Sequence, residues 1–285
     1  MLQNRTQAFL KRFELEEFPQ PEIIRLRYPV LLCHGYGAVA SLIKTSPMDE
    51  VCMHLRKHAI PAIAPNIVPY AKIETRGKQW VKKINEICDK HRFEKLNVVA
   101  HSMGGLDMRY ALHNSNIHKK VASLTTVSTP HHGSSLADWI LDYPDNIRER
   151  LGQIFNWFGE SIYPSTKSDA MGAVRQLTRD YIQNRFNPKY PPHPDLPVFS
   201  YASQVGKGTD QPLNRIYRFQ NNLIYDEEGP NDCFVSVESA KWAEFIETAP
   251  LSHMEHVKIA ISKDRIPLFE NFWIDIARRL QSEGF

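Results

Sequence analysis

The stretch LNVVAHSMGGLDMRY, residues 96–110, places a single serine between an apolar run and a pair of glycines. Ser102 is the centre of the pattern A-H-S-M-G, which has alanine where the general G-x-S-x-G pattern has glycine. An apolar strand that runs into such a pattern and then into a helix is typical of a nucleophile elbow, because the sharp turn lifts the hydroxyl clear of a sheet. The alternative is a small residue at the start of a helix. A reactive serine also needs a base and an acid from elsewhere in the chain.

Such a serine needs amide donors for the oxyanion that forms when it attacks a carbonyl carbon. The amide of Met103, directly after the serine, is the first candidate. The second is the amide of Tyr36 in the segment HGYG, residues 34–37, which follows the apolar run at 30–33. Glycines there would let the backbone come close to a substrate, although an ordinary glycine turn has the same composition.

The base must be one of twelve histidines. In α/β hydrolases the order along the chain is serine, acid, histidine, which leaves His253 and His256 in APLSHMEHVKIA as candidates. The acid should lie on a loop between the serine and that histidine. In DEEGPNDCFVSV, residues 226–237, Asp232 directly precedes a predicted strand and is the candidate, whereas the other three acids are typical of a solvated turn. A carboxylate in this place would hold the imidazole tautomer and stabilise its charged form.

The elements that must position these residues alternate between strands and helices. Apolar runs predict strands within 28–35, 60–68, 96–102, 121–130 and 196–203, and helical patterns lie at 46–60, 74–91, 103–114 and 266–285. Strands separated by helices of this length predict a mostly parallel sheet with flanking helices. The alternation stops after residue 134, and the apolar segment 136–195 predicts a helical insertion, either buried or a mobile lid over a pocket. We expect one domain over residues 1–285.

Composition excludes several classes of protein. The chain has 285 residues, 35 basic and 32 acidic, and these charges are scattered, so nucleic-acid binding is not indicated. No run approaches the roughly 18 apolar residues of a spanning helix. The N-terminal segment lacks the pattern of a secretory signal, and the four cysteines are far apart, which favours reduced thiols in an intracellular, cytoplasmic protein. A mitochondrial address is the expectation if the source is eukaryotic.

Taken together, the ordered motifs resemble a known family, the α/β-hydrolase triacylglycerol lipases of the Pseudomonas and Burkholderia type and the related intracellular fungal enzyme. The matching stretches are PVLLCHGYG, LNVVAHSMGGLDMRY, TTVSTPHHGSSLAD, FSYAS, NDCFVSVESAKWAEF and SHMEHV, and they span about residues 29–257. The resemblance implies that Asp232 is the acid of an N-D-G-x-V-S motif and that His253, in HME, is the base. Cys233 stands where that motif has glycine. Tyr36 again takes the place of the second oxyanion donor.

The resemblance also implies accessory features. Secreted members bind a structural calcium ion through an acidic residue two positions after the base, a place that Glu255 occupies here. Asp210 is a loose candidate for a second carboxylate ligand. The family places a lid between STPHHGS and FSYAS, which puts the moving part near 136–165. No foldase is expected as a partner, because the secretory signal of the foldase-dependent members is missing.

The predicted activity is that of a serine carboxylic ester hydrolase, a lipase or esterase that cleaves acylglycerols or other lipid esters through an acyl-enzyme. No cofactor is required for this chemistry, and peripheral contact with lipid interfaces is expected from the aromatic residues of 136–165. The alternative is an acyltransferase or phospholipase that uses the same three residues. A rival from another class is a catalytically silent scaffold, although a scaffold has no need of the complete serine, acid and histidine order.

Overall fold

The architecture is that of a computed structural model, in which residues 21–37, 46–145, 147–149, 152–153 and 166–285 are described. Within these residues, six strands form one parallel sheet in the order β2-β1-β3-β4-β5-β6. The strands are β1 (Val30–Cys33), β2 (Ala62–Ile63), β3 (Leu96–His101), β4 (Val121–Val127), β5 (Val198–Ser203) and β6 (Glu244–Ala249). The predicted α/β class with a parallel sheet is therefore confirmed.

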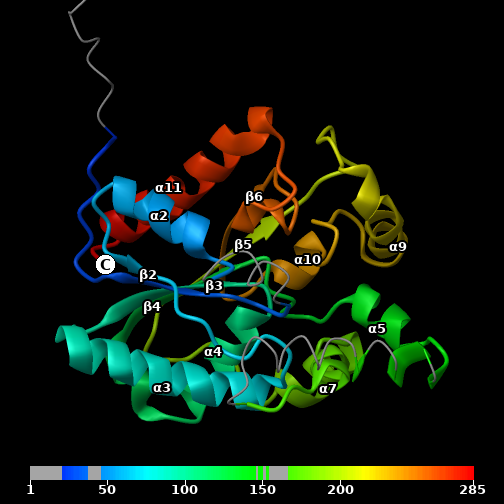
Figure 1. The fold of residues 1–285 in the computed structure, drawn as a ribbon, viewed down its shortest axis with the longest axis horizontal. Coiled ribbons are helices and arrows are strands. Elements are labelled where there is room, and N and C mark those ends of the chain that lie inside the picture. Colours follow the sequence, from blue (N-terminus) through cyan, green and yellow to red (C-terminus); the bar gives the residue numbers. More distant parts are fainter. Residues whose placement is uncertain (1–20, 38–45, 146, 150–151, 154–165) are drawn as a thin grey trace, which may run out of the picture.

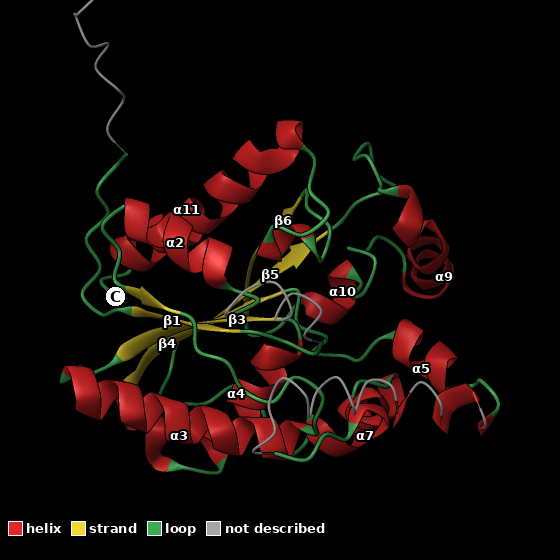
Figure 2. Cartoon of the chain, viewed as in Figure 1, coloured by secondary structure: helices red, strands yellow, loops and turns green. Residues whose placement is uncertain are grey.

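Helices cover both faces of the sheet, as Figures 1 and 2 show. Helices α2 (Asp49–Lys57) and α11 (Ile266–Ser282) lie on one face, and α3 (Ile73–His91) and α4 (Met103–His113) lie on the other. Parallel sheets need this double cover because both of their faces are apolar. Strands β1, β3, β4 and β5 are accordingly buried along their whole lengths.

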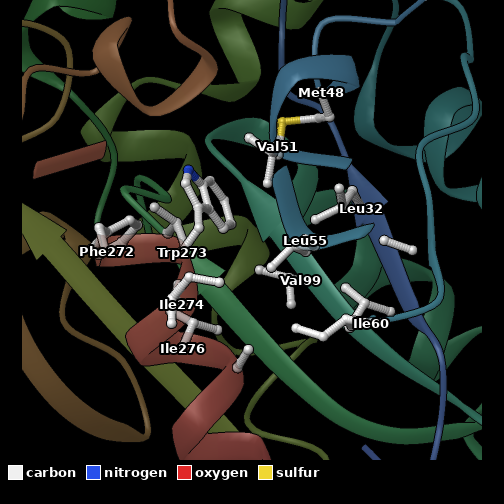
Figure 3. Packing of buried hydrophobic residues seen from close by; sticks show 14 of the residues in the cluster. Leu32, Met48, Val51, Leu55, Ile60, Val99, Phe272, Trp273, Ile274 and Ile276 are labelled. Carbon is white, nitrogen blue, oxygen red and sulfur yellow. The ribbon is translucent and has the colours of Figure 1, made fainter. Parts of the chain in front are cut away.

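The core on the first face is built by the apolar stripe of α11 and by α2 (Figure 3). Trp273 of α11 is 1% exposed and lies among Val51, Leu55 and the strand residues Leu32 and Val99. On the second face Trp80 of α3 is fully buried against the other side of the strands. Complete burial of each large apolar side chain contributes about 2 to 3 kcal/mol, so the two layers hold the sheet firmly from both sides.

The segment between β4 and β5 is helical in its described parts. It contains α5 (Ser135–Leu141), α7 (Ala170–Gln176), α8 (Arg179–Tyr181) and the π-helical turn η3 (Ile182–Phe186). Figure 1 places α5 and α7 beyond the ends of the strands. Residues 154–165, a part of the expected lid, lie outside the described residues, and the mobility of 136–165 stays a prediction.

Short helical elements complete the chain and carry several site residues. They are η2 (Asn116–Lys120), η4 (Arg215–Tyr217), α9 (Arg218–Glu228), α10 (Val237–Ala240), η5 (Glu255–Val257) and η6 (Lys263–Arg265). Helices α9 and α10 lie with α5 at one end of the sheet (Figure 1).

Two strand predictions need correction. No strand directly follows Asp232, because its carboxylate Oδ1 accepts hydrogen bonds from the amides of Phe234 (3.0 Å) and Val235 (2.8 Å) and turns the backbone back on itself. Strand β6 comes later, at Glu244–Ala249. The strand predicted within 60–68 is reduced to the two residues of β2, because the prolines of this segment lack the amide that a sheet ladder requires.

Candidate active site

Ser102 occupies the sharp turn between β3 and α4. Its backbone has φ 58° and ψ −136°, a left-handed region that non-glycine residues rarely adopt. The Ser102 amide donates to the carbonyl of Val127 (2.9 Å), which ties the turn to strand β4. A Cβ on Gly104 would lie 2.8 Å from the Cys33 carbonyl oxygen, so only glycine allows α4 to start this close to β1. This strained backbone is what a nucleophile elbow requires.

The loop after β1 approaches the same turn. A Cβ built on Gly35 would lie 2.5 Å from the Cβ of Ser102 and 3.0 Å from the amide nitrogen of Met103. This contact brings the segment that carries Tyr36 beside the amide of Met103, and Tyr36 lines the same cavities as Ser102. The two predicted oxyanion donors therefore lie on neighbouring segments of backbone.

A buried arginine that the sequence analysis missed holds this loop. Arg76 of α3 donates through Nη2 to the carbonyl of His34 (2.7 Å) and through Nε to Asp107 of α4 (2.8 Å), and both charged side chains are fully buried. It also donates to the carbonyl of Val68. Arg76 lies four residues before Trp80, on the face of the helix that the apolar period assigns to the core. This spacing is the feature of the sequence that indicates a buried arginine.

The acid and the base are joined by a short hydrogen bond. Nδ1 of His253 lies 2.8 Å from Oδ2 of Asp232, and the His253 amide donates to the Asp232 carbonyl (2.9 Å). Asp232 is fully buried and His253 is 6% exposed. His256 does not contact Asp232 through a hydrogen bond in the described structure, and its Nε2 instead lies 2.7 Å from the hydroxyl of Ser203. The geometry therefore selects His253 from the two candidates.

The surroundings favour an ionised Asp232. Burial alone would raise its pKa, but His253 and the amides of Val235 and Phe234 outweigh burial and hold the pKa of Asp232 below its usual value. Cys233 follows with φ 84°, so it keeps a backbone conformation that favours glycine. The replacement noted in the sequence thus leaves the glycine-like turn intact.

Two further histidines surround the base without adding charge. The rings of His101 and His253 are 4.5 Å apart between centroids, and those of His101 and His256 are 5.6 Å apart. Burial holds the pKa of His101 well below its usual value, and burial lowers that of His256 to about 3. Both are neutral near neutral pH, so neither opposes a positive charge on the imidazole of His253.

Two cavities meet at these residues, with volumes of about 170 Å³ and 230 Å³. Ser102, His253, Tyr36, Phe234 and Met254 line both. The first extends along α5 and α7, and the second along the loop after β1 and the segment after η5. Their remaining walls are mostly apolar, formed by Leu136, Ala137, Ile140, Val174 and Leu177 in the first and by Pro47, Tyr70, Val257 and Ile259 in the second.

The two residues considered for calcium have different surroundings. Glu255 is 6% exposed and pairs with Arg265, whereas Asp210 is exposed on the loop after β5. In the parts of the chain that the structure describes, no group of three or more histidines, cysteines or acidic residues could hold a metal ion. None of the described helices has the length and apolar character needed to cross a bilayer.

A parallel sheet between helical layers, with a strained serine at the carboxyl end of a central strand, defines an α/β hydrolase. The model of the alpha/beta hydrolase fold family matches residues 28–172, about half of the chain, and the chain belongs to that family. This result confirms the family and the fold that the sequence motifs predicted.

Comparison with individual proteins points to lipases. Triacylglycerol lipase 2 of Saccharomyces cerevisiae is 31% identical over 221 residues, which cover 74% of this chain and 61% of that protein. A triacylglycerol lipase of Pseudomonas fragi is 26% identical over 292 residues, 92% of this chain and 98% of the relative. The chain covers 50% and 45% of two further bacterial relatives of the same name. The crystal structure of Staphylococcus hyicus lipase has the same fold, with a TM-score of 0.70, 16% identity and coverage of 94% of this chain and 99% of that one.

Proposed function

We propose that the protein is a serine carboxylic ester hydrolase, a lipase or esterase that acts on acylglycerols or other lipid esters. One observation carries the proposal. The strained Ser102 shares two apolar cavities with His253, and His253 is held at 2.8 Å by a buried carboxylate of Asp232. The yeast and Pseudomonas fragi relatives, both named triacylglycerol lipase, support the same activity.

The reaction follows from the roles of these groups. Ser102 Oγ attacks the ester carbonyl carbon while His253 takes the hydroxyl proton, and the oxyanion is stabilised by the amides of Met103 and Tyr36. Collapse of the tetrahedral intermediate breaks the bond to the alcohol, which leaves with the proton from His253. Water then attacks the acyl-serine with the same base, and the fatty acid is released. Every catalytic group in these steps belongs to this chain.

The cavities support an apolar ester as the substrate. An ester has an acyl arm and an alcohol arm on either side of its carbonyl, and two cavities meet at Ser102. Apolar walls bind hydrocarbon because they remove it from water. We propose an intracellular site of action, which is supported by four buried cysteines that are free thiols.

The test is the rate of hydrolysis of p-nitrophenyl esters from short to long acyl chains by Ser102→Ala, Asp232→Asn and His253→Ala variants. We expect Ser102→Ala to lose about 10⁵-fold or more in kcat and Asp232→Asn about 10⁴-fold, because the residues act as a unit. Ser282→Ala, at the exposed end of α11, is the matched control and should keep the parent rate. A Ser102→Ala variant with full activity would refute the proposal, and a rate maximum at long acyl chains would select lipase over esterase.

A further inference from the structure

Three oxygen groups near the base converge on one buried cation, the guanidinium of Arg265. Nε donates to Oε1 of Glu255 at 2.7 Å, and Nη2 donates to Oε2 of Glu255 at 3.0 Å and to the carbonyl of Pro250. Nη1 donates to the side-chain oxygen of Gln211 at 3.3 Å. Arg265 and Glu255 are each 6% exposed, so the bidentate pair is shielded from water.

The segment that Arg265 holds is the one that carries His253. Pro250 and Glu255 bracket the base, and Oε2 of Glu255 also accepts a hydrogen bond from the amide of Ser252 at 2.7 Å. Asp232 holds His253 from the other side, through both its side chain and its carbonyl. The loop 250–255 is therefore fixed at both of its ends and at its centre.

The same oxygens are those that a calcium ion would use. Ca²⁺ takes six to eight oxygen ligands, mostly from carboxylates and carbonyls, and the family resemblance places a calcium ligand at Glu255. Here both carboxylate oxygens of Glu255 face Arg265, and its negative charge is already neutralised. The neighbour of Gln211, Asp210, is exposed. The residues present do not fit a calcium ion beside Arg265.

We propose that Arg265 is the resident cation of the base loop, a positioning residue that holds 250–255 and so sets the place of His253. The effect of Arg265 on catalysis rests on the proposed function. Its effect on the stability of the loop 250–255 is independent of that function. The planar guanidinium donates to several oxygens in a fixed geometry, which a lysine ammonium does not reproduce.

The experiment compares Arg265→Met, Arg265→Lys and the parent protein. We expect the thermal midpoint of the parent to be the same in calcium and in chelator. Arg265→Met leaves the buried carboxylate of Glu255 without its charged partner and should lower the midpoint by roughly 5 to 10 °C. On a short soluble ester its kcat should fall by up to about a hundredfold with little change in KM, because a displaced base slows chemistry more than binding. Arg265→Lys should recover part of kcat.

Arg278→Met is the matched control, because Arg278 lies on the adjoining helix α11 and pairs with Glu22 and Asp275 at half-exposed positions. It should change neither kcat nor the response to calcium. If Arg265→Met does not fold, Glu255→Gln tests the same pair with less change in shape and should show the same fall in kcat.

A parent midpoint that calcium raises and chelator lowers would overturn the proposal, and so would an unchanged kcat in Arg265→Met. A parent protein that hydrolyses no ester would instead refute the proposed function, and the thermal measurements would still decide whether Arg265 or calcium holds the loop.

Discussion

At the scale of single residues, four buried histidines make this protein sensitive to acid. His34, His101, His131 and His256 are each at most 5% exposed. Burial lowers the pKa of His34 and His256 to about 3, and it lowers those of His101 and His131 well below the usual value. In the unfolded chain each would titrate near pH 6.5. The unfolded state therefore binds more protons than the folded state at mildly acidic pH.

The sign of the effect follows from this difference in proton binding. The stability that depends on these neutral histidines is fully present above about pH 6.5 and is lost as pH falls toward about 3. Well below pH 6.5, the free energy of unfolding falls by about 1.4 kcal/mol for each histidine and each pH unit. Between about pH 6.5 and 5.5 we expect the four histidines to remove roughly 4 kcal/mol of the free energy of unfolding. Urea unfolding at the two pH values measures this loss.

His256→Asn is a useful comparison in the same experiment, because asparagine can keep a hydrogen bond to Ser203 but does not titrate. The slope of the free energy of unfolding against pH should fall by the equivalent of about one proton, because one fewer histidine takes up a proton on unfolding. A parent protein whose stability is the same at both pH values would show that the buried histidines are not held neutral. Asp232 does not interfere, because its lowered pKa affects stability only in more acidic solution. Burial raises the pKa of Asp107 to about 7, which has the opposite sign and offsets about 1 kcal/mol of the loss over the same interval.

At the scale of elements, the close fit of α4 against β4 depends on Gly105. A Cβ at this position would lie 2.3 Å from Oγ1 and 2.7 Å from Cγ2 of Thr129, just beyond β4. The Thr129 hydroxyl donates to the carbonyl of Ser102 at 2.7 Å. Helix α4, the segment after β4 and the nucleophile turn are thus coupled at a single contact.

Gly105→Ala should therefore destabilise the protein although alanine is the better helix former. Overpacking costs about 1 to 3 kcal/mol and the strained Thr129 bond about 1 kcal/mol more, against a gain of about 1 kcal/mol in helix propensity. The expected net loss is about 1 to 3 kcal/mol in urea unfolding, with a lower kcat. In a Thr129→Ala background most of the loss should disappear, and an equal loss in both backgrounds would exclude the steric explanation.

The sequence predicted most of the elements and the central residues of the site for identifiable reasons. Buried parallel strands are uniform apolar runs, and the serine turn has a local pattern, so β3, Ser102 and α4 could be recognised directly. The choice between His253 and His256 could not be made from spacing, because it depends on which ring reaches Asp232. Arg76 and Arg265 were missed because a buried arginine is revealed by its partners, which come from distant segments.

Strand β6 shows a different limit. Only its last residue, Ala249, is buried, and Glu244 and Glu247 are exposed, since the strand lies at the edge of the sheet. A strand with two glutamates does not give the continuous apolar signal on which the other predictions depended. Earlier in the chain, the carboxylate of Asp232 forms a turn with the amides of Phe234 and Val235 where apolar residues suggested a strand.

At the scale of the whole molecule, apolar side chains and arginines gather on η4 and α9, beside helix α5. Ile216 is 67% exposed and Phe219 is 61% exposed, and the ring of Phe219 is 5.1 Å from that of Trp139 on α5. Helix α5 lines the cavity, and α9 packs against it (Figure 1). Arg215 and Arg218, next to Ile216 and Phe219 in the chain, are also exposed. A surface of this kind suits a lipid interface with anionic head groups.

The double variant Ile216→Ser, Phe219→Ser should weaken binding to phosphatidylglycerol vesicles by about tenfold or more in a flotation assay, because the inserted apolar area is lost. Its rate on a short soluble ester should not change. The control is Ile23→Ser with Met53→Ser, which removes two exposed apolar side chains from another part of the surface. Equal loss of vesicle binding in both double variants would contradict a specific role for this surface.

The two edges of the sheet have a consequence for self-association. An edge strand exposes unpaired amides and carbonyls that can recruit a strand from another molecule, and long apolar edges promote aggregation. Here one edge is β2, only two residues long, and the other is β6 with its outward glutamates. Both edges are poor templates for an added strand, so crowded molecules of this protein are protected from joining sheet to sheet.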